Sequence, residues 1–312
     1  MLDQALKGRH FLDVADFSSA ELDGLLDAAV NLKTKLKAGE PTVVLPGRVL
    51  AMVFMKKSTR TRVSFEVGIQ QLGGIALFLA GSELQLGHGE TIRDTATTLS
   101  RYVHAVMIRA VDHADVTGFA EHATVPVING MSGTSHPCQT MADLLTMREH
   151  FGRIRGLRVV YLGAGLNVGT SLMHGCTKLG VDYVFCGPEG FEPPAGALEK
   201  ARRFAAESGG AVTIVRDTLE AVRGADIVCT DGWTPPELHD QSEARALALA
   251  PYRVDAALLA AAGPQARVMH CLPAHYGEEI TEEMVHSPQS LVFDEAENRL
   301  HAQKAVMAAV IR

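Results

Sequence analysis

The chain lacks any apolar stretch long enough to cross a membrane. No run of about 18 apolar residues, the shortest that suggests a transmembrane helix, occurs along it. The first residues, Met1 to Gln4, also lack the hydrophobic core of a signal peptide. We therefore expect no membrane partner and, by default, a cytoplasmic location.

Paired cysteines are lacking too. The cysteines number five, an odd count, and no two of them form a Cys-x-x-Cys pair. A disulfide framework or a zinc site is therefore not expected. Free cysteines in a reducing compartment are mostly small buried hydrophobic residues. The five are Cys138, Cys176, Cys186, Cys229 and Cys271.

An excess of positive charge is also missing. The formal net charge is −7 and is spread along the chain, which argues against nucleic acid or an anionic membrane as the main partner. Hydrophobic residues make up 47% and charged residues 21%, as in an ordinary enzyme. We find no internal repeat and no low-complexity tract. A length of 312 residues exceeds the size at which one core keeps growing, so two domains are predicted.

What the chain does have is a dense cluster of anion-binding side chains, Ser58-Thr59-Arg60-Thr61-Arg62. The cluster follows the apolar run Val49–Phe54, which is typical of a buried parallel strand, and the chain after Glu66 looks helical. Free backbone N–H groups at a helix start, hydroxyls and guanidinium groups all donate to phosphate oxygens. A solvated charged surface is the alternative, but five such donors directly after a buried strand favour a phosphate site. The run lacks a glycine-rich lead-in and a Gly-Lys-Ser/Thr ending, so we expect a small phosphorylated molecule and not a nucleotide.

Two successive series of helix and strand signals predict the fold class α/β, with two doubly wound parallel-sheet domains and ligands in the cleft between them. Ser18-Ser19-Ala20-Glu21 predicts a helix start. The expected strands are Val49–Phe54, Ile75–Leu79, Ala105–Ile108 and Val125–Asn129, then Leu157–Leu162, Asp182–Cys186, Ala211–Val215, Asp226–Cys229 and Arg267–His270, with Ser290–Phe293 as a further candidate. Later helices are expected at Met141–Glu149, Leu198–Ser208, Thr218–Arg223 and His301–Ile311, the last packing back on the first half. The domains would be 1–140 with helix 297–312, and 150–296.

The glycine-rich turn Gly163–Gly169 resembles a dinucleotide-binding fingerprint only at first sight. Its third glycine comes one place late, and the next strand ends in Cys186-Gly187 where an acidic ribose ligand is wanted. We interpret it as a tight strand-to-helix turn in which Asn167 either faces the ligand or simply caps the helix.

Other polar residues follow predicted strands of the first half. His136-Pro137-Cys138-Gln139 precedes a helix, and both His136 and Gln139 can hydrogen-bond a carbonyl oxygen, although a lone histidine is more often structural. Arg109 ends a strand, where it either meets a ligand or is solvated. Gln85 lies in the polar loop Ser82–Glu90, long enough to move as a lid.

Asp231 and His270-Cys271-Leu272-Pro273 follow strands of the second half. A thiol near a carboxylate could orient and deprotonate an amine. A Cys–His nucleophilic pair is the rival, but adjacent residues on a strand point to opposite faces, so His270 is badly placed to serve Cys271. Glu297–Lys304 is expected to open the terminal helix, with Arg299 in its first turn as a further phosphate donor.

Taken together, these motifs resemble the aspartate/ornithine carbamoyltransferase family over almost the whole chain. The resemblance rests on the Ser-Thr-Arg-Thr-Arg, His-Pro-Cys-Gln, His-Cys-Leu-Pro and Glu-Asn-Arg-Leu-His-Ala-Gln-Lys segments, jointly and in this order. The last two segments and Asp231 resemble the ornithine branch. So does the loop around Gln85, which lacks the lysine of the aspartate branch.

The resemblance implies transfer of a carbamoyl group from carbamoyl phosphate to the side-chain amine of L-ornithine, giving L-citrulline and phosphate in arginine biosynthesis, without metal or organic cofactor. It also implies a homotrimer, or a multiple of trimers, in which Gln85 serves a neighbouring site. The carbamoyl phosphate site would comprise Ser58, Thr59, Arg60, Thr61, Gln85, Arg109, His136, Gln139, Cys271, Leu272 and Arg299, and the ornithine site Asn167, Asp231 and Cys271. The catalytic residues would be Arg109, His136, Gln139, Asp231, Cys271 and Arg299.

Two segments depart from the family pattern. The ornithine branch normally has Trp-x-Ser-Met-Gly after its aspartate, whereas Pro235, Pro236 and Glu237 stand here in place of Ser-Met-Gly. Ala164 and Leu166 replace the usual Asp and Asn. The acceptor could therefore be another amine, such as an acylated ornithine, lysine or putrescine. The remaining rivals are a nicotinamide dehydrogenase, suggested only by the glycine turn, and a non-catalytic family member.

Overall fold

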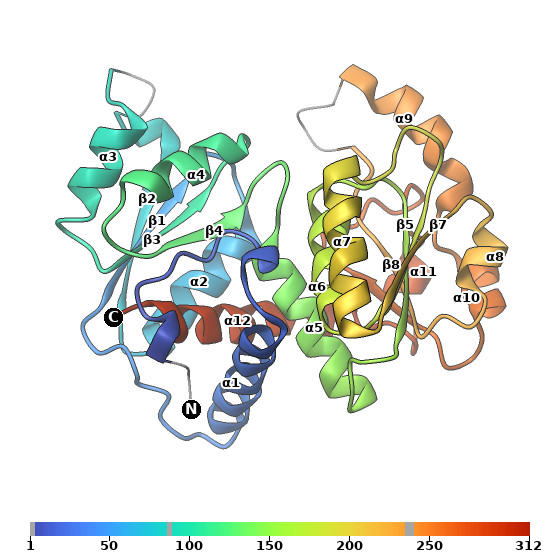
Figure 1. Cartoon of the computed structure of the whole chain (residues 1–312), viewed down its shortest axis with the longest axis horizontal. Coiled ribbons are helices and arrows are strands. Elements are labelled where there is room, and N and C mark those ends of the chain that lie inside the picture. The colour runs from blue at the N-terminus through green and yellow to red at the C-terminus, as the bar shows by residue number, and fades with distance from the viewer. Residues whose placement is uncertain (1–3, 86–88, 235–239) are drawn as a thin grey trace. The chain divides into compact units, whose positions relative to one another are not determined.

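The computed structural model of the chain describes residues 4–85, 89–234 and 240–312 (Figure 1). The chain divides into two compact units. Unit 1 comprises Met1–Leu145 with Glu297–Arg312, and unit 2 comprises Thr146–Ala296. Each unit is built around one parallel sheet, so the predicted α/β class with two doubly wound domains is confirmed.

Unit 1 contains a four-stranded parallel sheet in the order β2-β1-β3-β4. The apolar side chains of one sheet face pack against α3 and α4. Figure 1 shows α2 and α12 on the other side of the sheet. The strands are β1 (Val49–Phe54), β2 (Ile75–Ala80), β3 (Ala105–Arg109) and β4 (Val127–Met131). The helices are α1 (Ser19–Lys37), α2 (Thr59–Gln71), α3 (Ile92–Leu99), α4 (His113–His122), α5 (Pro137–Phe151) and α12 (Val292–Val310), with 3₁₀ turns at Gln4–Leu6, Val14–Asp16 and Gly81–Glu83.

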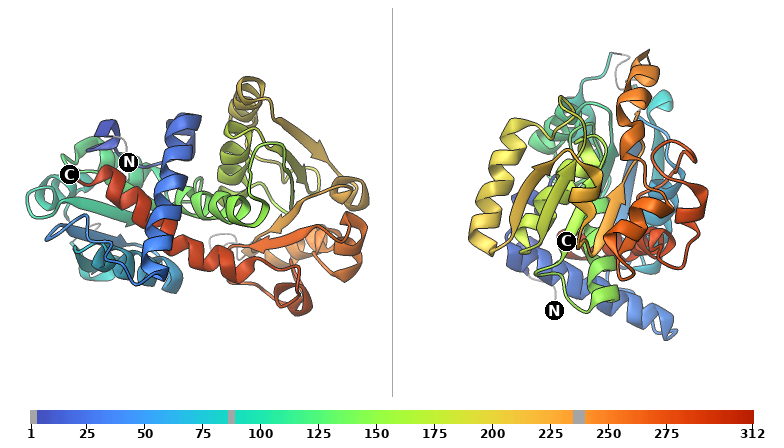
Figure 2. Two further views of the ribbon diagram at one scale, coloured as in Figure 1. Left: turned by 90° about the horizontal axis from the view of Figure 1, so that it is seen from below. Right: turned by 90° about the vertical axis from the view of Figure 1, so that its right-hand side faces the viewer.

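Unit 2 contains a five-stranded parallel sheet in the order β7-β6-β5-β8-β9. Helices α6 and α7 cover one face, and α8, α10 and α11 pack on the other around the apolar core of the unit (Figures 1 and 2). The strands are β5 (Arg158–Leu162), β6 (Asp182–Cys186), β7 (Ala211–Val215), β8 (Ile227–Thr230) and β9 (Arg267–His270). The helices are α6 (Asn167–Lys178), α7 (Ala195–Ser208), α8 (Thr218–Val222), α9 (Ser242–Leu249), α10 (Ala256–Ala262) and α11 (Glu282–Val285), with a 3₁₀ turn at Ala250–Tyr252.

The C-terminal helix α12 packs back on unit 1, as the sequence predicts. The buried Lys304 donates from Nζ to Thr42 Oγ1 at 3.3 Å and to Gln71 Oε1 at 2.9 Å. Near the other end of this segment, Lys33 of α1 donates to Asn298 Oδ1 at 2.8 Å. Polar side chains thus fix the last helix of the chain against elements of the first half.

Several sequence predictions about this architecture were wrong. Ser290–Phe293 is not a strand, because only Ser290 forms a bridge, to Val268, and α12 begins at Val292 and not at His301. The Ser290 hydroxyl accepts from the Val292 N–H at 3.3 Å and so helps to turn the chain into the helix. Arg299 therefore lies inside α12 and not in its first turn. Helix α5 starts at Pro137 and not at Met141, and proline is a residue favoured at a first helical position.

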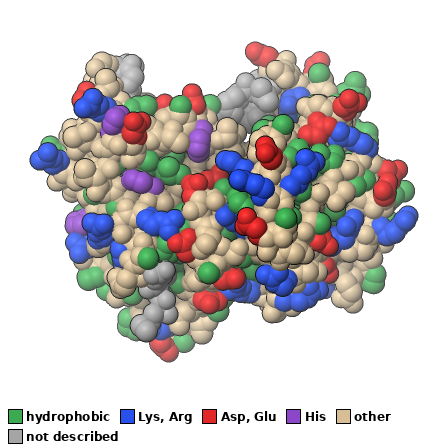
Figure 3. All heavy atoms as spheres, in the orientation of Figure 1, with side chains coloured by type: hydrophobic (Ala, Val, Ile, Leu, Met, Phe, Trp, Pro, Cys, Tyr) green, Lys and Arg blue, Asp and Glu red, His purple; other side chains and the backbone are tan. Residues whose placement is uncertain are grey.

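Charged side chains of both signs are interspersed over the face shown in Figure 3, in line with the spread of charge along the sequence. Among the described helices, none combines the length and the hydropathy that a membrane span requires.

Candidate active site

The start of α2 presents the predicted anion-binding donors at the end of β1. Ser58 is the N-cap residue, with φ −164° and ψ 121°, and its hydroxyl accepts from the Thr61 N–H at 3.3 Å. Thr59 is exposed and Arg60 half-buried, so both remain reachable from solvent. A helix N-terminus of this kind carries free N–H groups and a positive dipole end. The predicted strand-to-helix junction is confirmed.

Two guanidinium groups converge on the side chain of Thr61, which is buried. Thr61 Oγ1 accepts from Arg109 at 3.3 Å and from Arg299 at 3.1 Å. Arg299 also donates to Gln139 Oε1 at 2.6 Å, and Gln139 Nε2 donates to Asp143 Oδ1 at 2.7 Å. The structure therefore joins residues from α2, β3, α5 and α12 in one network within unit 1. Cationic side chains gathered in this way form an anion site.

His136 is buried beside this network and stays neutral. Burial is the main reason why the pKa of His136 lies well below its ordinary value. Three cations reinforce the effect, namely Arg299, Arg109 and Arg60. A neutral imidazole in such surroundings can donate a hydrogen bond from its N–H to a carbonyl oxygen without titrating near neutral pH.

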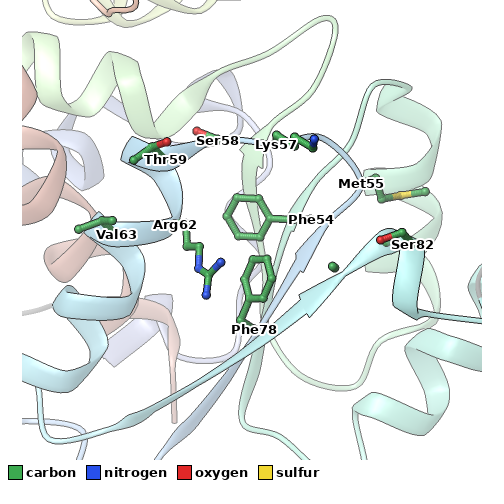
Figure 4. A pocket seen from close by; sticks show the side chains of 11 residues that line it. Phe54, Met55, Lys57, Ser58, Thr59, Arg62, Val63, Phe78 and Ser82 are labelled. Atoms are coloured by element: carbon green, nitrogen blue, oxygen red, sulfur yellow. The ribbon is translucent and has the colours of Figure 1, made fainter.

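Arg62 turns away from the other donors of its run. Its guanidinium carbon lies 3.7 Å from the centroid of the Phe78 ring, and its Nε is 3.6 Å from Glu66 Oε2. Figure 4 shows Arg62 beside Phe78 in a pocket of about 660 Å³. The pocket is lined by Phe54, Met55, Lys57, Ser58, Thr59, Arg62, Val63, Phe78, Ala80, Gly81 and Ser82.

In unit 2 the strands β8 and β9 pair in register, Thr230 with His270. Asp231 and Cys271 therefore both follow paired strand ends at the same edge of the sheet. Asp231 is buried, and its Oδ1 accepts from the Tyr161 hydroxyl at 2.5 Å. Burial raises the pKa of Asp231 to about 7. A carboxyl group poised in this way can hold a cation or take a proton near neutral pH.

His270 is engaged on both ring nitrogens. Its Nδ1 accepts from the Leu272 N–H at 2.8 Å, and its Nε2 lies 3.1 Å from Glu279 Oε1. His270 therefore supports the backbone after β9 and forms no nucleophilic pair with Cys271, as the strand geometry predicts. Leu272 has φ 58°, a left-handed conformation that is uncommon without glycine and is often found at functional sites.

Asn167 and Gln85 lie at the start of α6 and in the loop after β2. Asn167 is the first residue of α6 and its Oδ1 accepts from the Val168 N–H at 2.9 Å, but the N-cap residue is Leu166 and, among the described residues, no side chain caps the helix, so the helix-capping interpretation was wrong. Gln85 is exposed in the loop after β2. The substituted loop residues Pro235, Pro236 and Glu237 lie outside the described residues.

Three residues of these clusters were missed by sequence reasoning. Asp143 orients Gln139, Tyr161 binds Asp231, and the buried Arg245 donates to the Trp233 carbonyl oxygen at 2.8 and 3.0 Å. Tyr161 stands in an apolar strand run and Asp143 in an apolar helix. For these two residues, the only signal in the sequence was a polar side chain among apolar neighbours.

Comparison with known proteins gives full-length matches to one family. The family model "Aspartate/ornithine carbamoyltransferase, carbamoyl-P binding domain" matches residues 9–149, and the model of the Asp/Orn binding domain of the same family matches residues 155–310. An ornithine carbamoyltransferase of Thermococcus kodakarensis is 50% identical over 307 residues, covering 98% of each chain. That of Symbiobacterium thermophilum is 50% identical over 306 residues, covering 98% of this chain and 99% of the relative. The solved structure of the Pyrococcus furiosus ornithine carbamoyltransferase matches with a TM-score of 0.95 and 49% identity, covering 98% of each chain. The chain therefore belongs to the aspartate/ornithine carbamoyltransferase family.

Proposed function

We propose that this protein transfers the carbamoyl group of carbamoyl phosphate to the side-chain amine of L-ornithine, producing L-citrulline and phosphate for arginine biosynthesis. The observation that carries the proposal is the network in which Arg109 and Arg299 both donate to Thr61 and Arg299 also donates to Gln139. The similarity to ornithine carbamoyltransferases over the whole chain supports the choice of ornithine.

Unit 1 is the carbamoyl phosphate-binding domain in this proposal. The N–H groups and hydroxyls at the start of α2, with Arg60, bind the phosphate oxygens. Neutral His136 and the Gln139 amide contact the carbamoyl group, and Arg109 and Arg299 stabilise the negative charge that develops as phosphate leaves. The proposed binding residues in this unit are Ser58, Thr59, Arg60, Thr61, Arg109, His136, Gln139 and Arg299.

Unit 2 binds the amino acid. The side-chain amine of ornithine has a solution pKa near that of lysine, about 10, and it attacks only as a neutral amine. Asp231 and Cys271 are positioned at neighbouring strand ends to bind this amine and favour its neutral form, and Asn167 contacts the amino acid. Cys271 and Leu272 also meet the carbamoyl group.

The active form is a homotrimer or a multiple of trimers in this proposal. Gln85 reaches carbamoyl phosphate in a neighbouring subunit, since its loop is exposed and carries no other assigned role. A closed cyclic assembly repeats one heterologous contact around its axis, so every site would receive the same residue from its neighbour.

A second acceptor is favoured by one observation. Ala164 packs with Trp233 and Leu249 in a buried apolar cluster, joined by Leu166 and Phe191. This cluster includes Leu166, which directly precedes Asn167 in the chain, so it favours an acceptor with fewer charged groups than ornithine. A panel of ornithine, N-acylated ornithine, lysine and putrescine, assayed for ureido product with carbamoyl phosphate, decides between these amines.

The phosphate assignment is tested with Arg60→Ala. Removing one such donor is expected to lower turnover by about 100- to 1000-fold while the circular dichroism spectrum stays that of the parent. Arg202→Ala removes an exposed arginine of α7 and serves as the matched control, with unchanged turnover expected. Undiminished turnover of the Arg60→Ala protein would refute the assignment.

A further inference from the structure

We propose that Tyr161 is a positioning residue for the acceptor amine, because its hydroxyl group fixes the buried Asp231 carboxylate in one orientation. The proposal rests on the proposed function of Asp231. It states that Tyr161, a residue of a neighbouring strand, sets the charge state of the Asp231 carboxylate.

The sheet of unit 2 places the two side chains together. Strands β5 and β8 pair in parallel, with Tyr161 opposite Cys229 and Leu162 opposite Thr230. Asp231 follows directly after β8, so its carboxylate meets the end of the Tyr161 side chain at the carboxyl edge of the sheet. The Tyr161 hydroxyl donates to Asp231 Oδ1 at 2.5 Å. Hydrogen bonds from a hydroxyl to an ionised carboxylate fall in this range.

The tyrosine ring has no freedom to move away. Tyr161 is completely buried and stacks against Tyr183 and Phe185 of the neighbouring strand β6, each with a centroid distance of 6.4 Å and with interplanar angles of 25° and 20°. Gly169 of α6 supplies the space for the ring, since a Cβ atom there would lie 2.7 Å from Cε1 of Tyr161. Burial also raises the pKa of Tyr161 well above its ordinary value, so the hydroxyl stays protonated and acts as a donor.

The groups around Asp231 act on its charge in opposite directions. Burial raises the pKa of the carboxyl to about 7, and the hydrogen bond from Tyr161 is the strongest opposing influence. Glu279 raises this pKa further, and Arg245 lowers it less than Tyr161 does. The remaining titratable neighbours are Tyr183 and Cys229. Both also act on the pKa of Tyr161. Tyr161 is therefore the side chain on which ionised Asp231 depends most.

The test is the pH dependence of kcat/KM for ornithine in Tyr161→Phe. Removing a hydrogen bond to the ionised form raises the pKa of Asp231 and moves the acid limb of the profile to higher pH. A rise of about one pH unit predicts a roughly ten-fold loss of kcat/KM at pH 6 that disappears above about pH 9, with an unchanged KM for carbamoyl phosphate.

Tyr183→Phe is the matched control. Tyr183 is also fully buried, but its hydroxyl donates to the Gly169 carbonyl oxygen at 2.9 Å and to no carboxylate. This variant loses the same atom from the adjacent strand, so its pH profile is expected to run parallel to that of the parent. A Tyr161→Phe profile parallel to the parent, or an equal shift in both variants, overturns the proposal.

A readout without turnover separates this proposal from the proposed function. NMR titration of the carboxyl carbon of Asp231 in ¹³C-aspartate-labelled protein follows the same group in the absence of substrates. A higher midpoint in Tyr161→Phe than in the parent supports the role of Tyr161 even if ornithine is not the acceptor. Identical midpoints overturn it even if ornithine is carbamoylated.

Discussion

Burial gives two ionisable side chains of the proposed site unusual charge states. It lowers the pKa of His136 and raises that of Asp231, because a buried site disfavours the charged form of either group. In unit 1 the neighbouring arginines strengthen the shift, whereas in unit 2 the Tyr161 hydroxyl opposes it. His136 is thereby reserved for hydrogen bonding, and Asp231 is left able to change its charge near pH 7.

The charge on Asp231 has a cost in stability that depends on pH. Its folded pKa of about 7 lies above the ordinary value of 3.8, so the folded state binds the proton more tightly and this group destabilises the fold progressively between about pH 4 and pH 7. We expect Asp231→Asn, which keeps an acceptor for Tyr161, to be as stable as the parent near pH 3, where the carboxyl is protonated in both states, and more stable at pH 8 by about 4 kcal/mol. Urea unfolding at the two pH values measures this.

Arg202→Ala is again a suitable reference for that experiment, since its exposed site should give no pH-dependent difference. Equal stability of Asp231→Asn and the parent at pH 8 would show that the carboxylate is not penalised by burial. Carbamoylation of ornithine should be lost in the same variant, because an amide cannot accept a proton.

At the scale of single elements, serine caps begin both α1 and α2, and only one of them belongs to the proposed site. Ser18 caps α1 in a capping box, accepting from the Glu21 N–H while Glu21 Oε2 accepts from the Ser18 N–H at 2.8 Å. Ser58 caps α2 at the proposed phosphate site. The same substitution at the two positions therefore separates helix stability from substrate binding.

We expect Ser18→Ala and Ser58→Ala each to lower the free energy of unfolding by about 1 kcal/mol, the usual cost of losing a serine N-cap. Only Ser58→Ala should raise the KM for carbamoyl phosphate, because a hydroxyl is lost where the phosphate binds. Urea unfolding and initial rates at varied carbamoyl phosphate concentration measure the two effects. A raised KM in both variants would indicate that the helix caps act through general destabilisation.

The strands were predictable because buried parallel strands are continuous apolar runs, and Val49–Phe54, Asp182–Cys186 and Ala211–Val215 have the predicted bounds. Strand β4 begins at Val127 and not at Val125, since Pro126 has no N–H to give to the ladder. The run Ser290–Phe293 failed because four apolar-rich residues fit a strand or a helix start equally well.

The donor-rich motifs were visible in the sequence, but their connections were not. Arg299 and Gln139 lie 160 residues apart in the chain, and only folding shows that one donates to the other. Tyr161 could not be recognised either, because a tyrosine inside an apolar strand run is most simply a core residue. Sequence alone thus gave the chemical groups, whereas the hydrogen bonds that set their charge required the fold.

At the scale of the whole molecule, the proposed assembly makes each active site depend on two chains. Arg60 belongs to the chain that binds the phosphate, and Gln85 is proposed to come from its neighbour. Two variants that are each impaired, Arg60→Ala and Gln85→Ala, should then complement each other when their subunits are mixed. A site is intact wherever a Gln85→Ala chain supplies Arg60 and an Arg60→Ala chain supplies Gln85.

Random exchange of equal amounts in a cyclic trimer restores about one quarter of the sites, because each site requires one ordered pair of chains. We expect turnover near that fraction of the parent value after joint unfolding and refolding of the two variants, and no gain when either variant is refolded alone. Light scattering on the unmixed parent should give a mass that is a multiple of three chains of 33.4 kDa. Absence of any recovered activity in refolded mixed trimers would place Gln85 in the same site as Arg60 of its own chain, or outside the site altogether.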